Sequence, residues 1–266
     1  MLHCGFTAMG CPAPEDTHPL HGELPNIPYD TAMLTVEDDS MTLSGSCRYR
    51  VGFTADYTFA PSVTLAADAT VFDLEIAATN HRRAPMEYMY LCHVNFRPED
   101  GGELVYSAPY DPAHVKVHYK FEGITDPDAY RRLRAYMDAI AADPCVHHVF
   151  DQTRECYDPE ICMTVFYSPD AQGFAHTMQV LPDGWVYYIA HEVAPLPYVV
   201  RWLSRTGDEE ACGMALPATA EHNGFIKARA DGQVRTLGSG ETYRAKMRVG
   251  LLAPEEATAM RRQLGK

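Results

Sequence analysis

The alternation of apolar and polar residues along the chain predicts an antiparallel β protein. Every second residue of segment 243–251 is apolar, and basic residues lie between them; residues 70–77 alternate in the same way. A period of two gives a strand one buried and one wet face. Between residues 33 and 77 no segment of helical length separates the strands, as parallel pairing would require. Further strands are predicted at 33–37, 47–59, 161–167, 175–181, 185–192 and 198–203.

Three segments depart from this pattern. Residues 126–143 predict a helix, with Asp126 as its cap, Pro127 in its first turn and apolar residues on one face. We expect this helix to be an insertion that packs over a sheet edge. A short C-terminal helix is predicted to begin at Pro254. The first 30 residues hold five prolines and three glycines, which predicts a long irregular loop.

Composition narrows the function. The 266 residues carry a formal net charge of −14, so we expect no nucleic-acid partner and no anionic membrane partner. No apolar run reaches the roughly 20 residues that cross a bilayer. The eight cysteines form no C-x-x-C pair and no signal peptide precedes them, which predicts reduced thiols and a cytoplasmic location.

The leading candidate for a reactive group is His93. It ends the apolar run 87–94, and Asn95 follows it just before a Pro- and Gly-containing turn at 97–102. A strand that ends next to such a turn brings a polar side chain to the rim of a sheet, where a ligand can reach it. Histidine titrates near neutral pH and is therefore suited to proton transfer.

Four stretches resemble the aldose 1-epimerase (galactose mutarotase-like) superfamily, and more closely its shorter, epimerase-like branch. They are residues 19–22, 91–96, 196–202 and 214–219, the last followed by Asn223 and Gly224. The resemblance runs from about residue 5 to the end. It implies a single all-β domain over residues 1–266, an antiparallel β-supersandwich that is N-terminally short relative to the family. It also implies an isomerase of carbohydrate metabolism that interconverts the anomers of an aldose by acid/base ring opening, without a cofactor.

The resemblance also implies roles for individual residues. His93 matches the proton donor, and His21 matches a second histidine that contacts the sugar ring. The family has a glutamate before the Pro-Ala-Thr stretch, where this chain has Leu216, so the base is unidentified. Glu221, five residues further on, is the candidate substitute. The candidates for binding the sugar are Asn95, Trp202, Glu87 and Glu192, with Trp202 stacking on the ring.

The leucine at position 216 leaves alternatives open. One is a carbohydrate-binding protein without catalysis, and another is a different, metal-assisted sugar isomerase on the same scaffold. For the latter, His114 and His118 with His147 and His148 are candidate ligands, although their spacing is loose. Retention of both His21 and His93 favours an enzyme. The expected partners are a small-molecule carbohydrate and a second copy of the chain that pairs at an open sheet edge.

Overall fold

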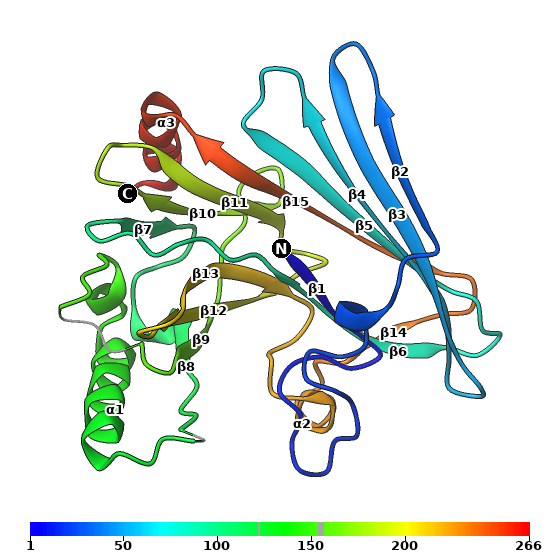
Figure 1. Ribbon diagram of the computed structural model, residues 1–266, viewed down its shortest axis with the longest axis horizontal. Helices are drawn as coiled ribbons and strands as arrows, with labels where there is room; N and C mark the ends of the chain where they lie inside the picture. Colours follow the sequence, from blue (N-terminus) through cyan, green and yellow to red (C-terminus); the bar gives the residue numbers. More distant parts are fainter. Residues whose placement is uncertain (122, 154–156) are drawn as a thin grey trace.

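The computed structural model describes residues 1–121, 123–153 and 157–266 and contains two antiparallel sheets (Figure 1). The first sheet has the order β1 (Leu2–Phe6), β6 (Met86–His93), β13 (Glu210–Ala218), β12 (Tyr198–Arg205), β9 (Ile161–Val165) and β8 (Val115–Val117), and β14 (Arg235–Leu237) also pairs with β6. The second has the order β2 (Thr31–Val36), β3 (Ser40–Val51), β4 (Ala55–Ala66), β5 (Val71–Asn80), β15 (Thr242–Leu252), β11 (Val186–Glu192), β10 (Phe174–Val180) and β7 (Glu103–Tyr106). The predicted antiparallel β class is confirmed.

Within the described residues, three α-helices and three short 3₁₀ turns accompany the sheets. The helices are α1 (Pro127–Ala142), α2 (Phe225–Ala230) and α3 (Pro254–Leu264), and the turns are η1 (Leu24–Asn26), η2 (Pro112–His114) and η3 (Pro144–His147). The predicted inserted helix is confirmed: Asp126 caps α1, which packs beside the edge strand β8. The C-terminal helix is confirmed as α3. No helix among the described residues is long and apolar enough to span a membrane.

Two local predictions are wrong. Residues 47–59 form parts of two strands, because the chain turns back between Val51 and Ala55, with Phe53 in a left-handed conformation (φ 66°). Apolar and polar residues alternate on both sides of this tight turn, so the pattern alone predicts one continuous strand. The first 30 residues are not all loop, since β1 pairs with β6 along the edge of the first sheet. Helix α2 was not predicted, because six residues are too few to show a helical period.

The first sheet has two different faces, which follow from the two-residue period of its strands. One face shares the main core with the second sheet and includes Tyr90 of β6 and Val199 of β12. The opposite face carries a separate apolar cluster that includes Leu91 of β6 and Val200 of β12. This second face, not the shared core, forms the floor of the candidate site.

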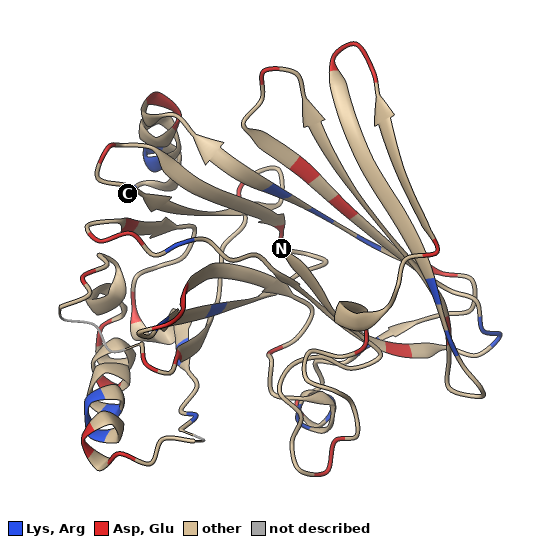
Figure 2. Cartoon of the chain, in the orientation of Figure 1, with Lys and Arg blue, Asp and Glu red and all other residues tan. Residues whose placement is uncertain are grey.

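Strand β2 is an exposed edge of the second sheet, at one end of the molecule (Figure 1). All six of its residues are exposed, and none of them is charged. Three acidic residues, at positions 37–39, lie instead at the tip of the β2–β3 hairpin, and Asp68 lies at the tip of the β4–β5 hairpin (Figure 2). An uncharged edge strand has unpaired backbone groups available to another strand. The homodimer expected from the sequence stays a prediction.

Arg201 on β12 is fully buried between the sheets and has no carboxylate among its observed partners. Its Nε donates to the carbonyl of Met214 (2.9 Å), its Nη2 donates to the Tyr167 hydroxyl (3.1 Å), and its Nη1 lies 2.8 Å from His147 Nε2. The guanidinium also lies over the ring of Tyr106, 4.2 Å from the centroid. One side chain therefore connects several elements behind the floor of the candidate site.

We expect Arg201→Met to lower the free energy of unfolding by about 2–4 kcal/mol, because it removes the hydrogen-bond donor from the Met214 carbonyl and from the buried His147 imidazole. Urea denaturation followed by far-UV circular dichroism measures this change. Arg50→Met is the matched control: this side chain is 63% exposed, and its loss should change stability by no more than about 0.5 kcal/mol. Equal effects of the two substitutions would contradict a stabilising role for Arg201.

Candidate functional site

A cavity of about 430 Å³ lies over the second face of the first sheet and contains both predicted histidines. Strand β6 ends at His93, β12 carries Trp202, and the loop after β1 carries His21. This volume lies within the range of about 300–1,000 Å³ that is typical of small-molecule sites. Asn95 also lines the cavity, so four of the residues predicted from the sequence meet here.

The three rings in this cavity form a contiguous set. The centroid of His93 lies 5.6 Å from that of His21 and 5.5 Å from that of Trp202, both edge-to-face. His21 has a left-handed backbone (φ 65°). Its carbonyl accepts a hydrogen bond from the N–H of Gly5 in β1, and its own N–H donates to the carbonyl of Gly10. The backbone of His21 is thus held in place independently of any ligand.

The hydrogen bond between His93 and Asn95 defines the protonation of the imidazole. Nδ1 of His93 lies 2.9 Å from Oδ1 of Asn95, and because an amide oxygen only accepts, Nδ1 carries the proton. In the neutral ring Nε2 is then an unprotonated acceptor. Burial, together with His21, lowers the pKa of His93 to about 4 despite the opposing hydrogen bond to Asn95. His93 is therefore neutral at pH 7, with roughly one molecule in a thousand protonated.

Glu160 is the only carboxylate among the described residues that line this cavity. It accepts a hydrogen bond from Nε1 of Trp202. Burial lowers the pKa of His21, and the negative charge of Glu160 opposes this effect. Sequence reasoning missed Glu160 because it stands in a turn-like Asp-Pro-Glu stretch just before β9. Only the pairing of β9 with β12, which sets Cys162 opposite Trp202, brings it to the site.

The floor of the cavity is apolar. Leu91, Val200 and Leu216 line it, and Val200 and Leu216 are cross-strand partners on β12 and β13. Leu216 stands where the family resemblance places a glutamate, so this part of the cavity offers a ligand no hydrogen-bonding side chain from that position.

Glu221 does not line the cavity, and its carboxylate belongs to a separate hydrogen-bond network. Its Oε2 accepts hydrogen bonds from Lys116 Nζ (2.7 Å) and Gln233 Nε2 (3.1 Å), and its Oε1 accepts one from the Thr164 hydroxyl (3.0 Å). Burial alone would raise the pKa of Glu221, but these hydrogen bonds lower it below its usual range. The carboxylate is engaged by these partners rather than directed at the histidine pair.

The next residue, His222, does line the cavity. Its Nε2 lies 3.2 Å from Sγ of Cys162, and burial lowers the pKa of His222 well below its usual value. Burial raises the pKa of the Cys162 thiol. The pair is therefore a neutral thiol beside a neutral imidazole at the edge of the floor.

The other two predicted sugar-binding residues lie away from His93. Glu87 forms an ion pair with Arg229 (3.2 Å) and lines a different cavity. Glu192 ends β11 in the second sheet, where it accepts a hydrogen bond from the backbone N–H of Lys246. The structure thus brings Asn95 and Trp202 to the histidine pair, but not Glu87 or Glu192.

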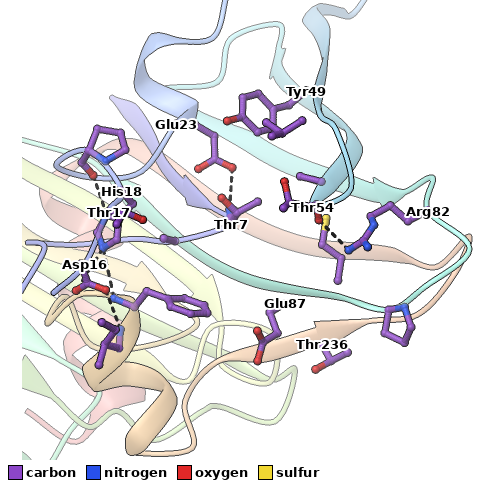
Figure 3. A pocket seen from close by; sticks show the side chains of 18 of the residues that line it. Thr7, Asp16, Thr17, His18, Glu23, Tyr49, Thr54, Arg82, Glu87 and Thr236 are labelled. Atoms are coloured by element: carbon purple, nitrogen blue, oxygen red, sulfur yellow. Dashed lines mark hydrogen bonds and ion pairs between the residues drawn. The ribbon is translucent and has the colours of Figure 1, made fainter.

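The cavity that Glu87 lines is the larger of the two, at about 830 Å³, and Figure 3 shows its polar side chains. Several of these side chains already form hydrogen bonds with backbone groups of the chain. Glu23 accepts a hydrogen bond from the N–H of Thr7, and Arg82 donates to the carbonyl of Thr54. His18 is the only histidine among its described lining residues. The smaller cavity is the stronger candidate. Its two histidines contact each other, and the same cavity also holds a carboxylate and an aromatic ring.

No group of three or more His, Cys, Asp or Glu side chains in the described part of the chain has the arrangement of a metal site. The histidines considered as ligands have other polar partners. His118 pairs with Thr164, His114 with Asp111 and His148 with the hydroxyl of Tyr106, each at 2.8 Å.

Comparisons with known proteins identify the fold. The family model of a domain of unknown function, DUF4432, matches residues 1–132, and no curated protein matches the sequence. Among solved structures, a proposed aldose 1-epimerase from Klebsiella pneumoniae is similar over 99% of this chain and 65% of its own, with a TM-score of 0.78 and 17% identity. A galactose mutarotase-like protein from Clostridium acetobutylicum is similar over 93% of this chain and 79% of its own (TM-score 0.58, 13% identity).

The chain therefore has the galactose mutarotase-like fold, as the sequence resemblance implies. It spans about two thirds of the length of the Klebsiella protein.

We expect NMR titration of ¹⁵N-histidine-labelled protein to give a pKa near 4 for His93 and the Nδ1–H tautomer above that pH. In Asn95→Ala the preference for this tautomer should be lost, because its acceptor is gone. A pKa of 6.5 or more for His93, or the Nε2–H tautomer in the wild type, would contradict the geometry described above.

Proposed function

We propose that this protein is an aldose 1-epimerase-like isomerase that binds a monosaccharide in the 430 Å³ cavity and interconverts its anomers. One observation carries the proposal: neutral His93, held at Nδ1 by Asn95, keeps Nε2 available as a proton acceptor. The fold shared with a proposed aldose 1-epimerase supports the same reading.

The reaction can proceed with one proton carrier. Nε2 of His93 takes the proton of the C1 hydroxyl, and the electron pair left on that oxygen forms the C=O bond of the aldehyde. The bond between C1 and the ring oxygen breaks, and its electron pair stays on the ring oxygen. The ring oxygen then takes the proton from the imidazolium. Rotation about the C1–C2 bond and the reverse steps give the other anomer.

This order of proton transfers explains how His93 acts as a proton donor although it starts neutral. It donates the proton that it has just accepted. Both exchanging oxygens are bonded to the same carbon, so a single imidazole can serve them in turn. A separate base in the place of Leu216 is then not required.

The other polar and aromatic groups of the cavity bind the sugar. Trp202 presents an indole to the C–H face of the ring. Glu160, oriented by the Trp202 N–H, accepts a hydrogen bond from a sugar hydroxyl. His21, in contact with His93, contributes a second polar contact to the ring.

A carbohydrate-binding protein without catalysis is the second candidate. It is favoured by Leu216, which leaves the apolar floor without a proton acceptor at that position. Both functions predict sugar binding, and only the first predicts faster anomer exchange.

We expect the wild type to accelerate mutarotation, measured by two-dimensional exchange NMR on freshly dissolved sugars. His93→Asn should slow kcat by at least about 100-fold, because it removes the proton carrier, while the affinity for the sugar changes only a few-fold. His81→Asn, just past the end of β5 and outside the cavity, is the control and should retain full activity. A wild type that binds sugars but never accelerates exchange would leave the binding protein as the function.

The pH dependence tests which form of His93 acts. The neutral imidazole starts the reaction, so kcat/KM should be constant from pH 7 down to about 5 and should fall as the pH drops through about 4. Polarimetry, corrected for uncatalysed mutarotation, measures this profile. A rate that increases toward pH 4 would instead show that the imidazolium is the active form.

A further inference from the structure

The cavity has a polar side and an apolar side. His21, His93 and Glu160 form the polar side, and Leu91, Val200 and Leu216 form the floor. The three floor residues are almost completely buried, with 3%, 2% and 1% of their surface exposed. A ligand that fills the cavity therefore meets hydrogen-bonding groups on one edge and hydrocarbon on another.

The floor begins directly beside the proton carrier. Leu91 and His93 lie on the same face of β6, two residues apart, which corresponds to about 6.6 Å along the strand. A substituent next to the ring oxygen of a sugar whose C1 lies at Nε2 of His93 can therefore reach Leu91. Val200 and Leu216 continue the same apolar surface on the neighbouring strands.

Leu216 has its place in this floor because Gly213 leaves room for it. A Cβ at Gly213 would come within 3.0 Å of Leu216 Cδ2, so the leucine side chain lies close over the backbone of this glycine. Cys162 and His222 also line the cavity, and Nε2 of His222 lies 3.2 Å from Sγ of Cys162. The floor is thus a packed apolar surface rather than a gap left by a missing side chain.

A sugar hydroxyl turned toward Leu91, Val200 and Leu216 would lose its water and find no donor or acceptor on them. Leaving a hydroxyl unpaired in this way weakens binding by a factor of about 5–100, whereas a methyl group in the same place gains from burial. The floor therefore discriminates between a hydroxymethyl and a methyl substituent.

We propose that the sugar bound in this cavity is a 6-deoxyhexose, whose C6 methyl group packs on Leu91, Val200 and Leu216 while its hydroxyl groups meet His21 and Glu160. The orientation rests on the proposed function, which sets C1 and the ring oxygen at His93. C6 is attached to C5, the other carbon bonded to the ring oxygen, so it projects from the same end of the ring.

Isothermal titration calorimetry with three matched pairs tests the substituent directly: L-fucose against L-galactose, L-rhamnose against L-mannose, and D-quinovose against D-glucose. We expect the deoxy sugar to bind about tenfold more tightly than its parent in at least one pair. The proposal is overturned if every parent binds as tightly as its deoxy partner, or if none of the deoxy sugars binds.

A substitution in the floor should remove this preference. Val200→Thr keeps the volume of the side chain and adds a hydroxyl group that can pair with a C6 hydroxyl. We expect it to bring the two affinities of the preferred pair within about threefold of each other. Leu216→Asn should act in the same direction, and Val36→Thr on exposed β2 is the control that should leave the ratio unchanged. An unchanged ratio in a folded Val200→Thr protein would count against the floor as its cause.

Mutarotation of the same sugars separates this inference from the proposed function. If a deoxy sugar binds preferentially but its anomer exchange is not accelerated, the proposed reaction fails and the ligand class stands. If the parent hexoses are converted through His93 without any deoxy preference, the reaction stands and the ligand class fails.

Discussion

The structure depends on the alternation of side chains along β6 and β12 of the first sheet. On β12, Arg201 points into the core between the sheets, while Val200 and Trp202, on either side of it, line the cavity. A register shift of one residue would send the guanidinium into the cavity and the indole into the core. On β6 the same rule separates Cys92, which is in the core, from His93. Packing of the core on the other face permits only one pairing register for β6 and for β12, and this register places the site residues in the cavity.

The low polarity of the cavity determines its chemistry. The burial that surrounds His93 with apolar side chains also keeps its imidazole neutral. Because its pKa is lowered to about 4, the imidazole of His93 has a basicity close to that of a carboxylate, which is the group that the family resemblance places at Leu216. The apolar side chains that form the floor therefore also contribute to the burial that keeps His93 neutral. The position of Glu160 beside Trp202 adds a single charge to this environment.

The sequence predicted those parts of the molecule that repeat a local pattern. Long alternating strands and the capped helix α1 were found in this way, and the motif resemblance identified His21 and His93, which the structure places in contact. What it could not predict depends on pairings between distant segments. Glu160 reaches the site only through the pairing of β9 with β12. Glu221 turns away because Lys116 of β8 and Gln233 hold its carboxylate, and its neighbour His222 takes the place at the cavity.

Strand β1 has a consequence for the dynamics of the site. Leu2 pairs with His93 on β6, and the N–H of Gly5 holds the carbonyl of His21. These five residues at the edge of the sheet therefore hold both histidines. An edge strand can open locally at a much smaller free energy than the whole domain. The geometry of the histidine pair is then only as stable as this short strand, so that fraying of β1 would disperse the pair in a molecule that is otherwise completely folded.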